Sequence, residues 1–334
     1  MKPAVLVTGA TGFAGSHAAD HLIAHGYPVR VLVRETSDVS WVHPEAERFV
    51  GDVRDPDSLV AMVRGVQWVF HFGGLIRARN RQEFMRANAD GTRHLYEAFV
   101  RHSEDPRLFL FCSSLAAVGP GRGGKLLVED DPPHPVTHYG ASKLAAEEFL
   151  LARERVEAVT SGARTRIVIV RPPAVYGPRD PSNLMLIRAI SRGWIPLPAP
   201  RGARVAAIHA EDLARGCRQL AERSAAEGVF HLSDGEVYSW QELGKIIAAI
   251  LEVRARRLPI PGWAGYLAAL TAEMWGRLWN RPPLFSRDKI KELRQRLYAC
   301  SIAKAQATAD FNPRWKIAAG LRQTLDWYRA SGWL

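Results

Sequence analysis

The sequence predicts an α/β fold in which helices cover both faces of a doubly wound parallel sheet. Apolar, strand-like segments alternate with amphipathic, helix-like segments over the first half of the chain, which is typical of crossover connections between parallel strands. A glycine-rich turn links the first strand to the first helix, and residues 107–114 are almost continuously apolar. Such an apolar strand indicates a sheet that is buried on both faces.

The expected elements follow in order along the chain. Residues 5–8 form an apolar strand, and the next helix has apolar residues on one side and ends at Gly26. Further strands are expected at residues 28–34, 47–52, 66–74, 107–114 and 163–178, and further helices at residues 55–65, 86–102 and 141–151. The composition changes after Arg171. Residues 194–205 are rich in proline and are predicted to be irregular, and from about Pro259 the chain is predicted to be helical.

Composition limits the class of protein. The 334 residues are 47% hydrophobic and 24% charged, as in ordinary globular proteins. The net charge of +11 comes from scattered arginines without a basic run, so we expect no nucleic-acid partner. No apolar stretch is long enough to cross a membrane, no signal peptide is visible and the three cysteines are far apart, which predicts a cytoplasmic protein with reduced thiols. The histidines lack metal-binding spacing, so no metal is expected.

Three glycines mark a candidate dinucleotide site. Gly9, Gly12 and Gly15, with Thr11 and Phe13 between them, follow the first strand and open the first helix. Such glycines permit a tight turn and a close approach of the backbone to a pyrophosphate, which the free N–H groups of a helix N-terminus can bind. Three glycines alone could mark a purely structural turn. A strand, a turn, a helix and a second strand in this order favour the binding site.

The end of the second strand bears on the choice of cofactor. An acidic residue there would bind the ribose 2′-hydroxyl of NAD, but this sequence has Arg34. A guanidinium can hold a 2′-phosphate through two hydrogen bonds, so NADP is the expected cofactor. The alternative is a solvated arginine at the end of the strand, with NAD as the cofactor.

Tyr139 and Lys143 stand four residues apart, where a helix is predicted to begin. This spacing places the phenol and the ammonium on one helical face. The pKa of a free phenol is near 10, and a nearby ammonium lowers it towards the range in which acid–base catalysis is efficient. An exposed pair without a catalytic role is the alternative, and the rest of the chain decides between them.

The full set of motifs resembles the short-chain dehydrogenase/reductase superfamily, and most closely its extended branch. The matching segments span essentially the whole chain. They are TGATGFAG (8–15), GDVRD (51–55), HFGG (71–74), NADGT (88–92), CSSLAAVG (112–119), YGASK (139–143), RPPAVYGP (171–178), IHAEDLA (208–214) and WYRASGWL (327–334). The branch includes nucleotide-sugar epimerases, 3β-hydroxysteroid dehydrogenases and dihydroflavonol reductases, and the resemblance implies a Rossmann-type sheet.

The resemblance implies roles for individual residues. Tyr139 would be the general acid and base, and Lys143 its partner. Ser114 would orient the substrate oxygen, with the adjacent Ser113 as the alternative. The cofactor would also meet Asp52 and Val53 at its adenine end, Phe72, Gly73 and Gly74 at its phosphates or ribose, and Pro172 and Pro173 at its nicotinamide. Ser113, Tyr139 and Lys143 would contact the cofactor as well, and Lys143 would hold the nicotinamide ribose. Asn88, His209 and Asp212 would be structural rather than catalytic.

Two parts of the chain are expected. Residues 1–171 would form the Rossmann domain, to which residues 205–234 return. Residues 172–204 and 235–334 would form a smaller, mainly helical and discontinuous part that covers the substrate.

Departures from the sugar-nucleotide subgroups favour an apolar substrate. Leu115 and Ala116 stand where dehydratases of the family place an acid pair, and Ala174 stands where many epimerases place an asparagine. We therefore expect an NAD(P)-dependent oxidoreductase that interconverts a secondary alcohol and a ketone on a sterol-like, long-chain or flavonoid-like substrate. A nucleotide-sugar epimerase of the same fold and a non-catalytic dinucleotide sensor are the alternatives. The complete Ser/Tyr/Lys set argues against the sensor.

Residues 259–285 carry aromatic and apolar residues at helical spacing. They are Trp263, Tyr266, Leu267, Leu270, Met274, Trp275, Leu278 and Trp279, accompanied by Arg277 and Arg281. A helix packed on the core is one interpretation. We favour a helix that lines or covers an apolar pocket above Tyr139, at the mouth of the site or at a lipid surface. Besides an apolar small molecule, peripheral membrane contact and a homodimer are therefore left open as partners.

Overall fold

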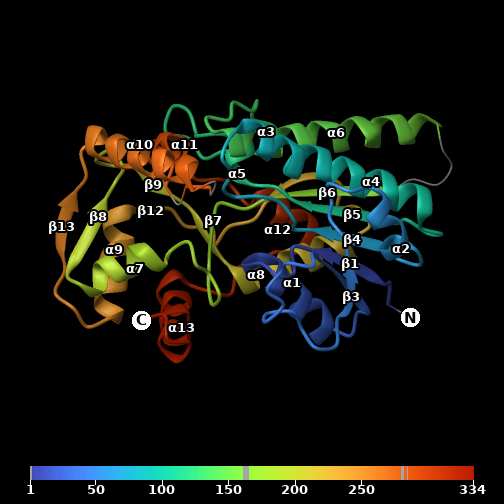
Figure 1. The fold of residues 1–334 in the computed structure, drawn as a ribbon, viewed down its shortest axis with the longest axis horizontal. Coiled ribbons are helices and arrows are strands. Elements are labelled where there is room, and N and C mark those ends of the chain that lie inside the picture. The colour runs from blue at the N-terminus through green and yellow to red at the C-terminus, as the bar shows by residue number, and fades with distance from the viewer. Residues whose placement is uncertain (1, 161–164, 280–281, 284) are drawn as a thin grey trace.

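The computed structural model describes residues 2–160, 165–279, 282–283 and 285–334, and it confirms the predicted fold class (Figure 1). A seven-stranded sheet has the order β11-β6-β5-β4-β1-β2-β3, and all its pairings are parallel. The strands are β1 (Val5–Thr8), β2 (Val29–Val33), β3 (Glu47–Val50), β4 (Trp68–His71), β5 (Leu108–Cys112), β6 (Arg166–Arg171) and β11 (Gly228–His231). The strand order reverses at β1, and ligands of doubly wound sheets bind at this point.

Helices cover both faces of the sheet because its strands are apolar on both sides. Leu108 and Leu110 of β5 are buried in one apolar cluster, and Phe109 and Phe111 in another. The first cluster includes residues of α1 (Phe13–Ala24) and α8 (Ala210–Glu222), and the second includes residues of α2 (Val60–Val63), α4 (Gly91–His102) and α6 (His138–Thr160). Figure 1 shows α4 and α6 on one side of the sheet and α1 on the other.

Most predicted elements are present with changed bounds. The strand expected at residues 47–52 ends at Val50, and the strand expected at residues 66–74 ends at His71. The helix expected at residues 86–102 begins earlier, because α3 (Arg81–Phe84) and a π-helical segment (Met85–Asp90) run directly into α4. The helix expected at residues 141–151 lies in the longer α6, which begins three residues earlier and ends nine residues later. The helix expected at residues 55–65 is a 3-10 turn (Asp57–Leu59) followed by α2.

The prediction that residues 194–205 are irregular is confirmed for residues 198–203 and wrong for the two ends of the segment, which form strands. β8 (Trp194–Leu197) pairs in parallel with β13 (Arg256–Pro259), and β9 (Arg204–Val205) pairs with β12 (Tyr238–Ser239) and β14 (Leu297–Tyr298). Each partner lies far along the chain, so local composition could not reveal the pairing. Proline is tolerated in β8 because an edge strand needs no N–H donor on its outer side.

The C-terminal part has a core of its own. Its elements include β7 (Ala174–Tyr176), α7 (Leu184–Ser191), α9 (Trp240–Ile250), α10 (Gly262–Leu278), α11 (Arg287–Leu293) and α13 (Ile317–Ala330). β10 (Ala207–His209) contributes to both cores, and α12 (Ala303–Ala309) packs with α8 in the core of the large sheet. Ile190, Ile247 and Leu325 are buried together there. β11 and α8 pack with the large sheet although they follow β7 in sequence. The domain boundaries given above remain a prediction.

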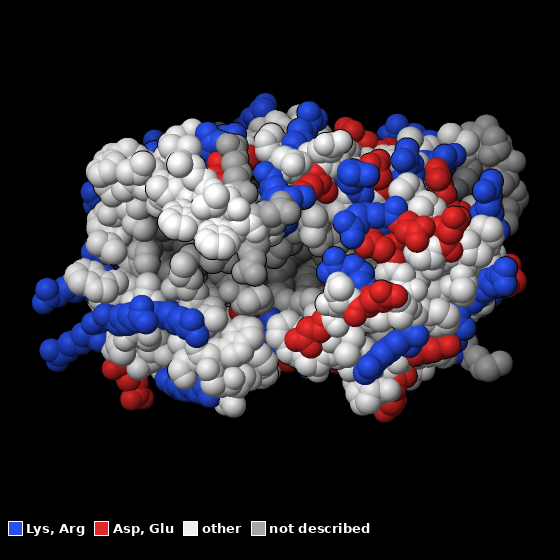
Figure 2. All heavy atoms as spheres, viewed as in Figure 1, with Lys and Arg blue, Asp and Glu red and all other residues white. Residues whose placement is uncertain are grey.

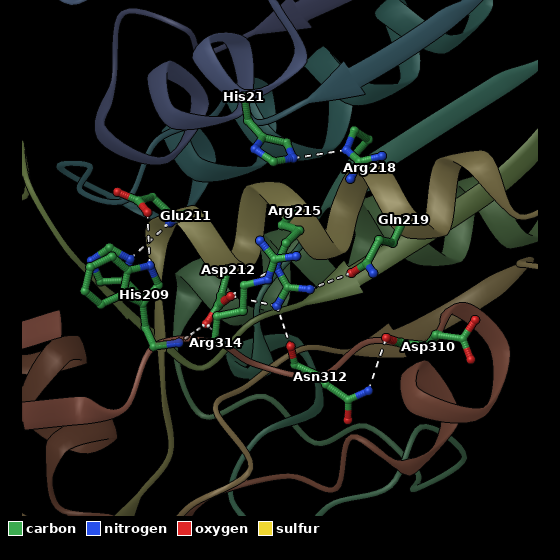
Figure 3. A network of polar contacts seen from close by, with 11 residues as sticks. His21, His209, Glu211, Asp212, Arg215, Arg218, Gln219, Asp310, Asn312 and Arg314 are labelled. Atoms are coloured by element: carbon green, nitrogen blue, oxygen red, sulfur yellow. Dashed lines mark hydrogen bonds and ion pairs between the residues drawn. The ribbon is translucent and has the colours of Figure 1, made fainter. Parts of the chain in front are cut away.

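His209 and Asp212 hold the first turn of α8 in place (Figure 3). The His209 ring accepts a hydrogen bond from the backbone N–H of Glu211 at 3.3 Å. The Asp212 carboxylate accepts two from Arg215, at 2.7 and 3.3 Å, and two from the backbone N–H groups of residues 314 and 315, each at 2.8 Å. These contacts join α8 to the segment before α13 and match the structural role expected for both residues.

None of the helices in the described ranges combines the length and the hydropathy needed to cross a membrane.

Candidate active site

The glycine-rich turn between β1 and α1 packs directly on the loop that follows β4. Gly9 has a φ of +76°, and a Cβ atom there would overlap the backbone of Phe72 and Gly73. A Cβ atom at Gly15 would overlap the carbonyl of Gly9. The Gly12 N–H donates to that carbonyl at 2.9 Å. A larger residue at Gly9 would therefore force the two loops apart, and one at Gly15 would push α1 away from the turn.

The N-terminus of α1 suits a bound anion. Gly12 is the N-cap residue and has no side chain to accept hydrogen bonds from the first N–H groups of the helix. Thr11 and Phe13 on either side are partly exposed. Free N–H groups and the positive end of a helix dipole attract phosphate. The turn therefore fits the pyrophosphate of a dinucleotide, with backbone groups as its ligands.

Arg34, Asp52 and Val53 lie at the edge expected for the adenine and its ribose. Arg34 directly follows β2 and is exposed. The Asp52 carboxylate is paired with Arg54, whose Nε lies 3.0 Å from Oδ1. This hydrogen bond holds the pKa of Asp52 below its ordinary value, and the charge of Arg34 acts in the same direction. Arg34 is therefore close enough to Asp52 to share one patch with it.

The loop after β4 lies between the glycine-rich turn and α6. The Gly73 N–H donates to the Thr8 hydroxyl at 3.0 Å, which fixes the loop to the end of β1. Gly74 has a φ of +150°, and a Cβ atom there would overlap the amide oxygen of Asn88 and approach Lys143 Nζ. The predicted cofactor residues of this loop thus lie beside a predicted catalytic residue.

Lys143 is buried beneath the site, with 4% of its surface exposed. Its ammonium donates to the carbonyl of Cys112 at 2.9 Å and lies 4.6 Å from the centre of the Phe111 ring. Burial lowers the pKa of Lys143 to about 8, and the neighbouring Cys112 and Glu147 oppose that shift.

Tyr139 occupies the first turn of α6, and its pKa is raised above the ordinary value. Burial of the phenol is the main cause, and the Cys112 thiol adds to it. A hydrogen bond with the Ser114 hydroxyl acts against the shift, while the Glu292 carboxylate acts with it. The expectation that Lys143 lowers this pKa is wrong for the structure, because burial dominates and the Lys143 ammonium is engaged with the Cys112 carbonyl.

The hydroxyl groups of the two adjacent serines have different surroundings in the structure. Ser114 is the N-cap of α5 (Leu115–Val118), where its hydroxyl accepts the Ala116 N–H at 3.1 Å, and the same hydroxyl meets the Tyr139 phenol. The Ser113 hydroxyl is buried and has no hydrogen-bond partner among the described residues. Of the two, Ser114 is the one that is brought to Tyr139.

Asn88 joins the loop after β4 to the start of α6. Its amide accepts the Leu75 N–H at 2.7 Å and donates to the Leu75 carbonyl at 3.0 Å. It also donates to the Ser142 hydroxyl at 2.9 Å, which in turn donates to the Tyr139 carbonyl at 2.7 Å. Asn88 lies in the π-helical segment, and such segments are common at functional sites. The structure thus gives Asn88 a supporting position, as expected.

Two ion-paired residues that sequence reasoning missed hold α6 against β6. Arg171 is the last residue of β6, and its Nη2 lies 2.6 Å from a Glu147 oxygen while its Nε lies 3.0 Å from the other. Both side chains are almost fully buried. A buried, doubly hydrogen-bonded pair is costly to break on one side only. The next residue, Pro172, accepts the Leu115 N–H at 2.8 Å, and Pro173 is partly exposed beyond it.

α11 reaches the catalytic helix from the C-terminal part. The Asp288 carboxylate accepts the His138 N–H at 2.5 Å, next to Tyr139. Glu292 follows Asp288 by four residues, hence on the same face of α11, and it is half-buried and paired with Lys289 at 2.8 Å. The sequence pattern of this segment contained no signal for either contact.

The aromatic residues of α10 do not line a space above Tyr139, contrary to the expectation from the sequence. A surface cavity of about 810 Å³ lies between α10 and α11. It is lined by Trp263, Tyr266, Leu267 and Leu270 together with residues of α11, and by none of Ser114, Tyr139 and Lys143. Packing on the core is wrong as well, because most of these side chains are exposed. Arg281 and the side chain of Arg277 lie outside the described residues.

The chain is similar to known proteins over almost its whole length. A model of the NAD dependent epimerase/dehydratase family matches residues 5–233. The ceramide reductase of Caulobacter vibrioides is 32% identical over 338 residues, covering 99% of this chain and 96% of that protein. The 3 beta-hydroxysteroid dehydrogenase/Delta 5-->4-isomerase of Mycobacterium tuberculosis is 26% identical over 348 residues, covering 97% and 90%. The UDP-glucose 4-epimerase of Thermotoga maritima shares the fold, with a TM-score of 0.80, 21% identity and coverage of 98% and 99%.

The resemblance drawn from the sequence motifs is thereby confirmed, since the family match spans the glycine-rich turn, both serines and the Tyr-x-x-x-Lys pair. The curated relatives are named for reduction and dehydrogenation. The chain belongs to the NAD dependent epimerase/dehydratase family and is an NAD(P)-dependent enzyme of the extended short-chain dehydrogenase/reductase type.

Proposed function

We propose that this protein is an NADP(H)-dependent reductase that converts a ketone of a long-chain lipid, of the ceramide class, into a secondary alcohol. The observation that carries the proposal is the packing of α5, which begins after Ser114, on the start of α6, which carries Tyr139: a Cβ atom at Gly140 would overlap the Ala116 carbonyl, and the Ser114 hydroxyl is near enough to affect the pKa of the Tyr139 phenol. Two hydroxyl groups that meet at the carboxyl edge of the sheet can both donate to one carbonyl oxygen.

Each catalytic residue has a separate task in this proposal. Ser114 donates a hydrogen bond to the carbonyl oxygen and holds it next to the phenol. Tyr139 gives its proton to that oxygen as negative charge develops there. The phenol is protonated at neutral pH, as a proton donor must be. When bound, the nicotinamide cofactor supplies the hydride.

Lys143 serves Tyr139 as well as the cofactor. Its ammonium lies beside Gly74 and the carbonyl of Cys112, under the loop proposed to contact the ribose. A positive charge there stabilises the phenolate that remains after proton donation. If the bound cofactor draws the ammonium towards its ribose, this charge would be free to stabilise the phenolate.

The substrate class rests on what the site lacks as well as on similarity. The residues after Ser114 are Leu115 and Ala116, both buried, so the described part of the chain places no acid pair there for eliminating water. Ala174 cannot make the amide hydrogen bonds of an asparagine. The relative named as a ceramide reductase aligns with almost the entire chain, so we take a lipid ketone as the substrate rather than a nucleotide-sugar.

The cofactor preference rests on Arg34. It is exposed at the end of β2, where an acid would select NAD, and its charge reaches Asp52. A guanidinium in this place favours the additional phosphate of NADP(H).

A turnover assay tests the proposal directly. The purified chain is mixed with NADPH and a 3-oxo-ceramide in detergent micelles, and the loss of nicotinamide absorbance is recorded together with the alcohol product. A parallel reaction contains UDP-glucose with NAD. Consumption of NADPH with formation of the hydroxy lipid supports the proposal. An epimerase returns its cofactor unchanged, so interconversion of nucleotide-sugars without net absorbance change, and no lipid product, overturns it.

A further inference from the structure

α10 presents its apolar residues to solvent instead of to the core. Seven of its large side chains, or of those directly after it, are between 46% and 74% exposed: Trp263, Tyr266, Leu267, Met274, Trp275, Leu278 and Trp279. Gly265 and Ala269 are the buried residues on the opposite side of the helix. The exposed positions recur every three or four residues, so they form one continuous face. An apolar patch of this extent on a protein surface marks an interaction site.

The segment that carries this face is strongly basic. Residues 254–296 contain ten arginines and lysines and only three acidic residues, so they hold much of the net charge of +11. Each acid is already paired with a base of the same segment: Glu273 with Arg287 at 2.8 Å, Asp288 with Lys291 at 3.7 Å and Glu292 with Lys289 at 2.8 Å. Figure 2 shows a broad surface of uncharged side chains at the end of the molecule where Figure 1 places α10.

We propose that the α10 face docks on the surface of an anionic lipid bilayer. Tryptophan and tyrosine are suited to the boundary between headgroups and acyl chains, because each has a large apolar ring and one polar atom. Arg256 and Arg257 in β13, and Arg294 directly after α11, are exposed and attract anionic headgroups. An apolar centre and a basic edge are both complementary to such a membrane.

A second copy of the chain fits this face less well. Two copies that met through α10 would bring the same basic edge of each subunit close to that of the other. Like charges opposite one another are costly, and the three acids of the segment are already paired within it. Anionic lipid supplies the missing negative charge.

Docking would place the lipid surface one helix away from the catalytic tyrosine. Glu273 of α10 is paired with Arg287 at the start of α11, and Asp288 of α11 accepts the His138 N–H next to Tyr139. The cavity of about 810 Å³ between α10 and α11 is lined in part by the exposed residues of the docking face. A lipid substrate could therefore leave the bilayer close to the site.

Vesicle flotation of the full chain tests the docking without any enzymatic turnover. We expect the chain to float with vesicles of phosphatidylcholine and phosphatidylglycerol and to bind much more weakly to pure phosphatidylcholine. Raising the salt from about 0.1 M to about 1 M shortens the Debye length from about 10 Å to about 3 Å and should release the protein. Failure to bind the anionic vesicles at low salt would overturn the docking proposal and leave the proposed reductase activity untouched.

Matched variants assign the binding to this face. W263S/W275S should weaken binding at least about tenfold, because each ring loses its burial in the interface. The control V50S/L126S changes two exposed apolar residues elsewhere and should bind like the wild type. R256Q/R257Q should lose the preference for anionic vesicles, whereas R48Q/R101Q, at two exposed arginines outside this segment, should keep it.

The oligomeric state tests the alternative that a second copy of the chain covers the α10 face. Sedimentation equilibrium of the wild type and of W263S/W275S is measured in the absence of lipid. A wild-type dimer that the double substitution converts to a folded monomer, with vesicle binding unchanged, would identify the face as a subunit interface and refute lipid docking. A circular dichroism melt establishes that each variant is folded.

Discussion

The Lys143 ammonium donates a hydrogen bond of 2.9 Å to the carbonyl of Cys112, at the carboxyl end of β5. This places a cation in an apolar environment, next to the Phe111 ring and the buried Cys112 thiol. Burial lowers the pKa of Lys143 to about 8 from 10.5. The buried ammonium therefore lowers the stability of the fold. It lies where the proposed chemistry needs a positive charge.

Replacing Lys143 by methionine should stabilise the fold while it impairs turnover. At pH 7 the ammonium is protonated in both the native and the unfolded chain, but burial disfavours it in the native chain. Its removal should therefore raise the free energy of unfolding by about 1–3 kcal/mol. Between about pH 8 and 10.5 the unfolded chain binds this proton and the native chain does not, so the stabilising effect of methionine should shrink as the pH rises. Urea unfolding at pH 7 and pH 10 measures both effects. The exposed Lys125→Met is the control, and a Lys143→Met protein less stable than wild type at pH 7 would contradict the assignment.

Tyr139→Phe should lower kcat by about 10²–10⁴-fold, the usual contribution of a general acid. The affinity for cofactor should stay nearly the same, because one hydroxyl is lost and little binding surface. Stopped-flow kinetics and cofactor titration by fluorescence measure the two quantities. Wild-type kcat in this variant would remove Tyr139 from the mechanism.

The two serines should respond differently to alanine. Ser114→Ala removes the hydroxyl that meets Tyr139, so we expect kcat to fall by about 10²–10³-fold, together with a loss of about 1 kcal/mol from the N-cap of α5. The buried Ser113 hydroxyl has no partner among the described residues, so Ser113→Ala should be neutral or slightly stabilising. Steady-state kinetics measure kcat of both variants, and thermal unfolding measures their stability. A larger loss of kcat in Ser113→Ala than in Ser114→Ala would assign catalysis to Ser113.

Arg34→Ala should weaken NADP(H) selectively. A charge-assisted contact with the 2′-phosphate contributes about 1.5–3 kcal/mol, which corresponds to about tenfold to a hundredfold in Kd. The affinity for NAD(H), which has no such phosphate, should barely change. Isothermal titration with both cofactors provides the comparison. Equal weakening of both, or a wild-type preference for NAD(H), speaks against the role of Arg34.

Glu292→Gln should shift the pH dependence of the reverse reaction. The Glu292 carboxylate helps to raise the pKa of Tyr139, so its neutralisation should lower that pKa. Oxidation of the alcohol requires the phenolate. The pH at which kcat/KM for oxidation rises should therefore be lower in this variant. The shift should be a fraction of a pH unit, because Glu292 is half-buried and paired with Lys289. Glu148→Gln, at an exposed acid on the same helix as Tyr139, should leave the profile unchanged.

Much of the site could be predicted because its signals are local. Gly9, Gly12 and Gly15 act within one turn of chain, and their close contacts with the loop after β4 explain why no side chain fits there. Tyr139 and Lys143 share a helical face by spacing alone. The alternation of strands and helices was enough for the parallel sheet.

Other features depended on partners far along the chain. β8 appeared irregular because β13, which completes its hydrogen bonds, comes some sixty residues later. Asp288 and Glu292 showed no signal because Asp288 lies 150 residues along the chain from the His138 N–H that it accepts. The pairing of Arg171 with Glu147 is similarly non-local.

The sequence by itself determined the sheet and the glycine-rich turn, because these follow from periodicity and from spacing within single elements. The Ser/Tyr/Lys set was implied by the resemblance to the short-chain dehydrogenase/reductase superfamily. Only the tertiary structure decided that Ser114 rather than Ser113 meets Tyr139, that burial raises the phenol pKa despite a nearby lysine, and that the aromatic residues of α10 face solvent. These outcomes depend on burial and electrostatics. Both are summed over side chains that are distant in sequence and meet only when the whole chain is packed.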